Sequence, residues 1–249
     1  MFMQFVNSQN NAIATGEKLM FTASYNISGM LTDLAQVSME TSEVKTSKAT
    51  LLRLKCTAAT YSKWDGFFKI RDLYESYVNP STLMPYLYKR DINEGSYSKS
   101  MKYTYNHKNN TVKTLQTKKK KGDGTWDEEK NISIQSGTKD IVSSLYNIRT
   151  LNFKDMTNGQ SKTFIVVFDR EEVIAKITLL GKETILTNIG KKACYKLAIS
   201  ASKTDVLKGE NNNLLWLTAD ENKIPVYAKF KIAIGNGELK IKSATGLKN

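Results

Sequence analysis

The sequence predicts a mainly β fold in which an antiparallel sheet packs against a single main helix. Apolar and polar residues alternate with a period of two through most of the 249 residues, and this period is typical of half-buried strands. Helical spacing occurs in one segment only. Strands and helices do not alternate along the chain, which disfavours a parallel sheet. Because only three prolines occur and no linker divides the chain, we expect residues 14–249 to form one β-rich domain.

The first strands are predicted at residues 17–30, 33–44 and 48–60. In the first of them Leu19, Phe21, Ala23, Tyr25 and Ile27 fall on one face. The second and third place Ala35, Val37 and Met39, and then Leu52, Leu54, Cys56 and Ala58, on one face. The connections are short, so the three strands should form an antiparallel meander.

An aromatic block at residues 62–80 follows, with a turn or short helix at Trp64-Asp65-Gly66 and a strand from about Phe67. Further strands are expected at 83–92 and 96–106. A lysine-rich hairpin spans 111–121 and 125–135, and Lys118 to Lys121 should lie at its tip, where charge is readily solvated.

One helix is predicted over about 139–150. Residues 138–140, Thr-Lys-Asp, offer oxygens for an N-terminal cap. Ile141, Leu145 and Ile148 recur at helical spacing and should face the sheet. Arg149 would lie near the C-terminus of the helix, where the helix dipole favours a cation.

The second half returns to strands. These are expected at 164–169, 173–181, 182–190, 193–202, 214–220 and 224–234. Residues 221–223 read as a hairpin turn, and Asp220 with Asn222 should cap it through side-chain bonds to the backbone. The segment 235–238, Gly-Asn-Gly-Glu, is predicted to form the last turn because its glycines permit positive φ angles.

The formal net charge is +13 and comes mostly from lysine. Lysines spread along strands are typical of a solvated face, and they discourage pairing between sheet edges. An anionic surface or polymer is the alternative partner. Nucleic acid is not expected as a partner, because base reading favours arginine and the chain has few arginines.

The N-terminus is apolar over residues 1–6 and is followed by small or β-branched residues before Gln9. We interpret residues 1–13 as a signal-peptide remnant or a disordered arm. No run of ~20 apolar residues is present, so no transmembrane span is expected. Cys56 is predicted to be a buried free thiol, with a disulfide to Cys194 as the alternative if the chain is exported.

Several motifs together resemble an exported family called domain of unknown function 3108. They are GEKLMFTASYN (16–26), WDGFFKIRDLYESYVNP (64–80), NEGSY (93–97), DIVSSLYNIR (140–149), GKETILTNIGKKACYKL (181–197) and WLTADENKIPVYAKFKIAIGNGELKI (216–241). The resemblance implies a periplasmic or envelope protein of Gram-negative bacteria. It also implies a curved antiparallel sheet or incomplete barrel around its helix, similar to lipoprotein-carrier half-barrels of the LolA/LolB type. It supplies no catalytic residues.

The leading functional hypothesis is a non-enzymatic envelope protein that holds a lipid or another apolar ligand in the concave face of the sheet. The candidate ligand-lining residues are Trp64, Phe67, Phe68, Tyr74, Tyr77, Tyr86 and Tyr88. Plain core packing is the competing interpretation of this set. An envelope scaffold that binds a protein partner by strand addition is the alternative function.

An enzyme is not expected, and the sequence predicts no catalytic residues, no cofactor and no metal. Asp65, Asp72 and Glu75 are carboxylates near the aromatic block, and two flanking a cleft could hydrolyse a glycoside. Asp72 and Glu75 should face opposite sides of their strand, however. Turn formation by Asp65 and ion pairing of Asp72 are therefore preferred, and a hydrolase of envelope polymers ranks below the binding functions. His107 lies in an Asn/Lys turn without a second metal ligand nearby.

Overall fold

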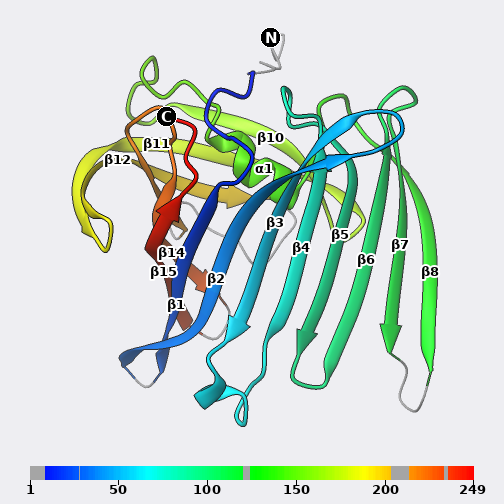
Figure 1. Ribbon diagram of the computed structural model, residues 1–249, viewed down its shortest axis with the longest axis horizontal. Coiled ribbons are helices and arrows are strands. Elements are labelled where there is room, and N and C mark those ends of the chain that lie inside the picture. Colours follow the sequence, from blue (N-terminus) through cyan, green and yellow to red (C-terminus); the bar gives the residue numbers. More distant parts are fainter. Residues whose placement is uncertain (1–8, 28, 120–123, 203–212, 233–234) are drawn as a thin grey trace.

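A computed structural model describes residues 9–27, 29–119, 124–202, 213–232 and 235–249. In these residues, fifteen strands form one sheet that curls into an unclosed barrel (Figure 1). The first half contains β1 (Lys18–Ile27), β2 (Met30–Lys45), β3 (Thr50–Thr60), β4 (Arg71–Val78), β5 (Pro85–Glu94), β6 (Tyr97–Asn106), β7 (Thr111–Lys119) and β8 (Thr125–Ser133). The second half contains β9 (Lys139–Asp140), β10 (Ser161–Phe168), β11 (Glu171–Thr187), β12 (Gly190–Ala201), β13 (Leu214–Thr218), β14 (Pro225–Ile232) and β15 (Gly235–Thr245). The predicted mainly β fold with one main helix is therefore confirmed.

The order of the strands makes β1 the junction between the two halves. Strands β8 to β1 run across the sheet in reverse chain order, and β15 to β9 continue on the other side of β1. Neighbouring strands are antiparallel except for the two-residue pairing of β9 with β10. The alternation predicted for β1 is confirmed at Leu19 and Phe21, which are fully buried on its concave side. It does not continue beyond the bulge between Ala23 and Ser24, because Ser24, predicted on the polar face, is buried.

The helix α1 (Ile141–Ile148) lies against the concave face and contacts β3, β4 and β10 (Figure 1). Asp140 caps its N-terminus as predicted. The Asp140 carboxylate accepts the backbone N–H of Ser143 at 2.8 Å, and the Ser143 hydroxyl oxygen lies 3.1 Å from the Asp140 N–H. Ser76 on β4 donates its hydroxyl to the same carboxylate at 2.6 Å. The capping residue therefore also connects the helix to β4 of the sheet.

Replacing Asp140 with alanine is expected to lower the free energy of unfolding by about 2 kcal/mol, because it removes the helix cap and leaves the buried Ser76 hydroxyl without its acceptor. Urea unfolding monitored by circular dichroism would measure the change. Asp140→Asn is the matched control, since the amide oxygen still accepts the Ser143 N–H. Equal losses in the two variants would contradict a capping role.

The buried face of α1 differs from the predicted stripe. Leu145 is 39 % exposed, whereas Val142 and Tyr146 are buried in the main core. The helix is rotated because Tyr146 fills the space beneath β2, where its hydroxyl lies 3.5 Å from the Glu40 carbonyl oxygen. Ile148 remains buried, in the second apolar cluster between the end of α1 and β11 to β13.

Three predicted boundaries are wrong for local reasons. The strand expected from Phe67 begins at Arg71, because residues 65–70 are held in a turn after the short 3₁₀ helix η1 (Ser62–Trp64). Residues 173–190 do not form two strands: β11 continues through Gly181, whose φ of 151° accommodates a bulge. The glycines at 235 and 237 lie inside β15, where the Phe230 ring packs over Gly237.

Candidate binding surface on the concave face

The turn between β10 and β11 is inserted against the concave face of β5 to β8. Its two central residues, Asp169 and Arg170, both have positive φ, at 44° and 70°, which is the geometry of a type I′ hairpin turn. The Arg170 N–H donates to the Tyr103 hydroxyl at 3.2 Å, and its guanidinium donates to Glu128 on β8 at 2.8 Å. The turn therefore links β8, at one edge of the sheet, to the hairpin of β10 and β11 near the other edge.

Arg90 on β5 holds the other side of this turn. Its Nη1 lies 3.0 Å from the Asp169 carboxylate. Its guanidinium lies between two rings, 5.6 Å from the centre of Tyr74 and 5.4 Å from the centre of Phe168, at distances typical of cation–π contacts. Within the described residues, the buried Nε of Arg90 has no hydrogen-bond partner, and neither has that of Arg170. Both side chains therefore retain donor capacity.

A row of basic and aromatic side chains continues from this turn towards β8. Lys99 on β6 and Lys118 on β7 lie directly opposite each other, and Trp126 on β8 is opposite Lys118. The Lys118 ammonium lies 5.9 Å from the Trp126 ring centre. Trp126 is 43 % exposed, and Tyr97 at the start of β6 is 49 % exposed. We call Lys99, Lys118, Tyr97 and Trp126 the basic-aromatic row.

Two lysines opposite each other in a sheet repel, and this pair is only partly neutralised. Lys99 lies 3.5 Å from Asp169, which also forms an ion pair with Arg90. In the part of the chain that the structure describes, Lys118 has no carboxylate within ion-pair distance. Burial lowers the pKa of Lys99, and the charge of Arg90 acts in the same direction. An anion placed between the two ammonium groups would relieve this repulsion.

Two carboxyl groups share the surroundings of Arg90. Asp72 on β4 is buried and accepts the backbone N–H of Asn93 at 2.9 Å. Burial raises the pKa of Asp72 and of Glu94, and the charge of Asp72 raises that of Glu94 further. The predicted ion pair of Asp72 is not present among the described residues. These two carboxyls therefore hold their protons more tightly than exposed carboxyls do.

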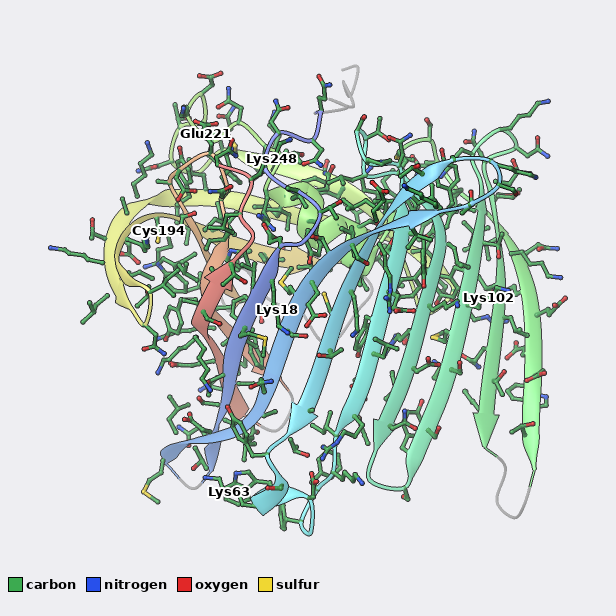
Figure 2. The ribbon with its side chains drawn as sticks, viewed as in Figure 1. Lys18, Lys63, Lys102, Cys194, Glu221 and Lys248 are labelled. Carbon is green, nitrogen blue, oxygen red and sulfur yellow. The ribbon has the colours of Figure 1, made fainter. Side chains whose placement is uncertain are left out.

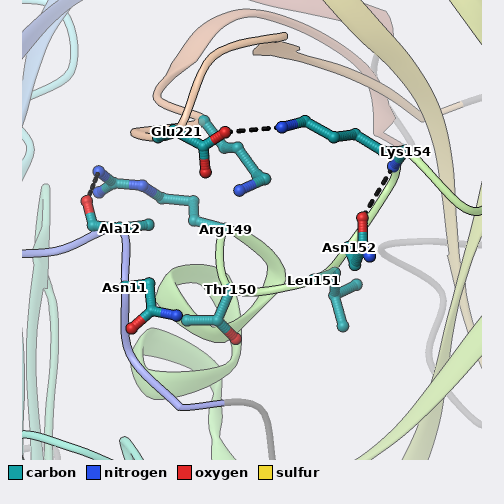
Figure 3. A pocket seen from close by; sticks show the side chains of 9 residues that line it. Asn11, Ala12, Arg149, Thr150, Leu151, Asn152, Lys154 and Glu221 are labelled. Atoms are coloured by element: carbon teal, nitrogen blue, oxygen red, sulfur yellow. Dashed lines mark hydrogen bonds and ion pairs between the residues drawn. The ribbon is translucent and has the colours of Figure 1, made fainter. Parts of the chain in front are cut away.

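A separate pocket of about 290 Å³ lies at the C-terminal end of α1 (Figure 3). Its floor is Arg149, which donates to the carbonyl oxygen of Ala12 at 3.3 Å and to Glu17. At its mouth Lys154 pairs with Glu221 at 2.8 Å. Burial lowers the pKa of Lys223, which also lines the pocket. The lining is polar and the volume suits a small group rather than an acyl chain.

A second pocket of about 310 Å³ lies over β11 and β12. It is lined by Gly159, Ser161, Lys176, Thr178, Leu180, Ala198, Ile199 and Ser200. Its lining is mixed, with Leu180, Ala198 and Ile199 beside polar side chains. None of the seven aromatic residues predicted to line a ligand site borders this pocket or the one at the end of α1.

The structure does not bring the seven predicted aromatics together. Tyr88 is buried in the core with its ring centre 5.2 Å from that of Tyr103, and Tyr74 packs beside the same core. The others are dispersed: Trp64 in η1, Phe67 and Phe68 exposed after it, Tyr77 beside Glu75 on β4, and Tyr86 against His107. Core packing thus accounts for two of the set, and ligand contact by any of them stays a prediction.

The predicted carboxylates occupy structural positions. Asp65 accepts a hydrogen bond from Thr60 and pairs with Arg71 at 2.5 Å, and these two contacts lower its pKa. Glu75 pairs with Arg53, on the face of β4 opposite that of Asp72, as the strand parity predicts. Among the described residues, no group of three His, Cys, Asp or Glu side chains is placed to hold a metal ion.

The remaining candidates also have local explanations. Asp220 accepts the N–H groups of Asn222 and Lys223 at 3.0 and 2.9 Å, so its predicted role in the hairpin cap is confirmed. The predicted role of Asn222 is wrong, because its side chain bonds the backbone of Asn249 instead. His107 is half-buried, with its Nε2 2.6 Å from the Pro85 carbonyl oxygen. Cys56 and Cys194 are free thiols.

The sequence interpretation missed the residues that organise the concave face, namely Arg90, Lys99, Asp169 and Arg170. The sequence does contain one indication of the turn at Asp169 and Arg170. Residues 164–175 read FIVVFDREEVIA, in which two apolar runs flank a central Asp-Arg pair. This is the pattern of a two-residue hairpin turn, although its usual glycine is missing.

The topology and the inserted turn define a class, that of open, curled antiparallel sheets resembling β-barrels. A β-barrel-like protein of domain of unknown function DUF1849 from Brucella abortus has a similar fold, with a TM-score of 0.57 over 93 % of this chain and 97 % of the other at 8 % identity.

The chain belongs to the family described as protein of unknown function DUF3108, whose model matches residues 21–242. The resemblance seen in the sequence is thereby confirmed.

Two other solved structures are less similar. One is a protein from Bacteroides fragilis provisionally described as exported, with a YmcC-like fold, at a TM-score of 0.34 and 9 % identity over 93 % of this chain and 96 % of the other. The second is from Parabacteroides distasonis and is provisionally described as a lipoprotein. It has a TM-score of 0.32 and 10 % identity over 93 % of this chain and 96 % of the other. No curated protein matches the sequence. Among the described residues, no helix is long and apolar enough to cross a membrane.

Proposed function

We propose that the protein is a non-enzymatic binding protein of the bacterial envelope that holds an anionic amphiphile, such as a lipid, on the concave face. The observation that carries the proposal is the pairing of Lys99 with Lys118 beside the exposed Trp126. An anionic headgroup would lie between the ammonium groups, where charge-assisted hydrogen bonds are strong. An adjoining apolar chain would contact Trp126 and Tyr97.

Different observations support the two parts of the proposal, the envelope location and the amphiphilic ligand. The apolar N-terminal pattern before Gln9 supports export, although residues 1–8 lie outside the described part of the chain. An amphiphile fits better than a fully apolar ligand, because α1 and the turn between β10 and β11 occupy much of the concave face. The open part of that face, towards Tyr97 and Trp126, carries both charge and exposed aromatic surface.

Binding is expected to require the two opposed lysines. In isothermal titration below the critical micelle concentration, lysophosphatidylglycerol should bind and lysophosphatidylcholine should bind at least ~10-fold more weakly, because a charge-assisted hydrogen bond contributes ~1.5–3 kcal/mol. The double variant Lys99→Met/Lys118→Met should lose this preference. Its stability should be unchanged or higher, since the repulsion is gone.

Lys102→Met is the matched control. Lys102 lies on β6 between the buried Met101 and Tyr103, so it faces the convex side, where Figure 2 labels it. This variant should bind as the wild type does. Equal affinity for the two lysolipids, or equal binding by the wild type and the double variant, would refute the proposal.

A second candidate function is recruitment of a partner protein by strand addition at β8. The observation that favours it is that β8 is the last strand at its edge of the sheet and is mostly exposed. A photo-crosslinking residue at Asn131 on β8 should then trap a specific envelope protein in cells. Absence of any crosslink at this position, with Asn131 still exposed, would argue against it.

A further inference from the structure

Two neighbouring hairpin tips expose large apolar side chains at one end of the molecule. In a meander, the connections β1–β2 and β3–β4 fall at the same end of the sheet, and Figure 1 shows them at its lower end. The first tip carries Met30, which is 73 % exposed, and the exposed Leu31. The second carries Phe67, which is 86 % exposed, and the exposed Phe68. We call these four residues the tip surface.

The tips are built and linked so that these side chains point outward. The Phe67 and Phe68 N–H groups both donate to the Trp64 carbonyl oxygen at 2.9 Å. The Trp64 indole donates to the Asp33 carbonyl oxygen at 2.9 Å, which joins the second tip to β2 beside the first. The ring of Phe68 packs near Gly95 in the β5–β6 turn. The exposure of the apolar side chains therefore belongs to a defined local structure.

Two lysines flank the apolar residues of the second tip. Lys63 and Lys69 are exposed on either side of Trp64 and Phe68, and Figure 2 places Lys63 at the lower end of the molecule. Of the nearby acids, Asp65 pairs with Arg71. Asp33 is exposed and forms no ion pair among the described residues, and its carboxylate accepts the Ser24 hydroxyl at 2.6 Å. Apolar side chains that project beyond flanking lysines match a surface with an apolar interior and an anionic boundary.

We propose that the tip surface docks on a membrane surface that contains anionic lipid. The four apolar side chains would enter the boundary between headgroups and acyl chains, and Lys63 and Lys69 would contact lipid phosphates. A membrane fits better than a protein partner because the apolar residues lie on separate projecting tips rather than in one groove. The chain's net charge of +13 favours the same anionic partner.

Docking in this way would orient the rest of the molecule. Figure 2 shows Glu221 and Lys248 at the end opposite Lys63, so the pocket at the end of α1 would face away from the membrane. Tyr97, at the start of β6 where the β5–β6 turn ends, would lie near the membrane. The open end of the basic-aromatic row would then face the lipid source, although docking does not depend on that row binding a ligand.

Vesicle co-sedimentation of the purified chain tests the proposal. Wild-type protein should sediment with vesicles of phosphatidylethanolamine and phosphatidylglycerol, and much less with phosphatidylcholine vesicles. The variant Phe67→Ser/Phe68→Ser should lower the partition coefficient about tenfold, because it removes two large apolar side chains from the contact. Binding should weaken as salt rises from about 0.01 to 0.15 M, as charge screening requires.

Leu186→Ser is the matched control, because Leu186 is also 86 % exposed but lies near the β11–β12 hairpin. It should sediment as the wild type does. Equal sedimentation of the wild type and the phenylalanine variant would overturn the proposal. So would self-association without vesicles that the phenylalanine variant abolishes, since the tips would then join two copies. Lys99→Met/Lys118→Met should still sediment, which separates this proposal from ligand binding.

Discussion

Replacing Arg149 with methionine should lower the free energy of unfolding by ~3–5 kcal/mol, the cost of leaving a buried charge without its partner. Glu17 and Arg149 are almost completely inaccessible to solvent and form two hydrogen bonds, each of 2.6 Å. Arg149 also donates to the Asn222 carbonyl oxygen at 3.1 Å. One side chain thus connects the N-terminal segment, α1 and the loop before β14.

A double-mutant cycle separates the ion pair from the rest of the site. Glu17→Gln/Arg149→Met should be more stable than Arg149→Met, because no charge is then buried alone. Urea unfolding of the four proteins gives the coupling energy. A loss below ~1 kcal/mol in Arg149→Met, in the range of an exposed pair, would contradict the buried arrangement.

Replacing Lys139 with methionine should have the opposite effect and stabilise the protein at pH 7. Lys139 is 6 % exposed, and its ammonium lies 2.9 Å from the Met84 sulfur. Burial lowers the pKa of Lys139 from 10.5 to about 8, against the opposing charge of Asp140. A shift of this size corresponds to a penalty of about 3 kcal/mol for keeping the amine charged in the folded state.

The pH dependence gives this prediction its sign. Between pH 8 and 10.5 the unfolded Lys139 holds its proton while the folded one releases it, so the wild type gains stability as pH rises through this window. The methionine variant lacks that contribution. Its advantage should therefore be largest at pH 7 and nearly absent at pH 10.5. Lys102→Met is the control, and an advantage that does not change with pH would contradict the argument.

The fold followed from the sequence because its alternation is strong where one face of a strand is buried. Leu19 and Phe21 on β1, and Leu52 and Leu54 on β3, lie on the predicted faces. The failures occurred where tertiary contacts override local pattern. Leu145 has ideal helical spacing, but the larger Tyr146 determines which side of the helix is buried. A glycine between two apolar runs suggests a turn, and the sequence therefore predicts the end of a strand at residue 181. In the structure Gly181 instead forms a bulge inside β11.

The candidate site could be predicted from the sequence less well than the fold. Arg90 and Asp169 are far apart in the chain and meet only because the β10–β11 turn reaches across the curled sheet. The opposition of Lys99 and Lys118 depends on the register of β6 and β7, which a sequence does not specify uniquely. Aromatic content pointed instead to residues 64–88, because aromatics mark cores as readily as binding surfaces.

The pairing of β1 with both β2 and β15 has a consequence for how the chain acquires its structure. Strands β1 to β8 can pair in the order in which they are synthesised, but the other edge of β1 must wait for the last strand of the chain. Until then an edge with the apolar Leu19 and Phe21 remains open to pairing with other chains. We therefore expect slow folding, limited by this long-range closure. We also expect that the partly folded chain must be protected from aggregation until β15 has been synthesised and has paired with β1.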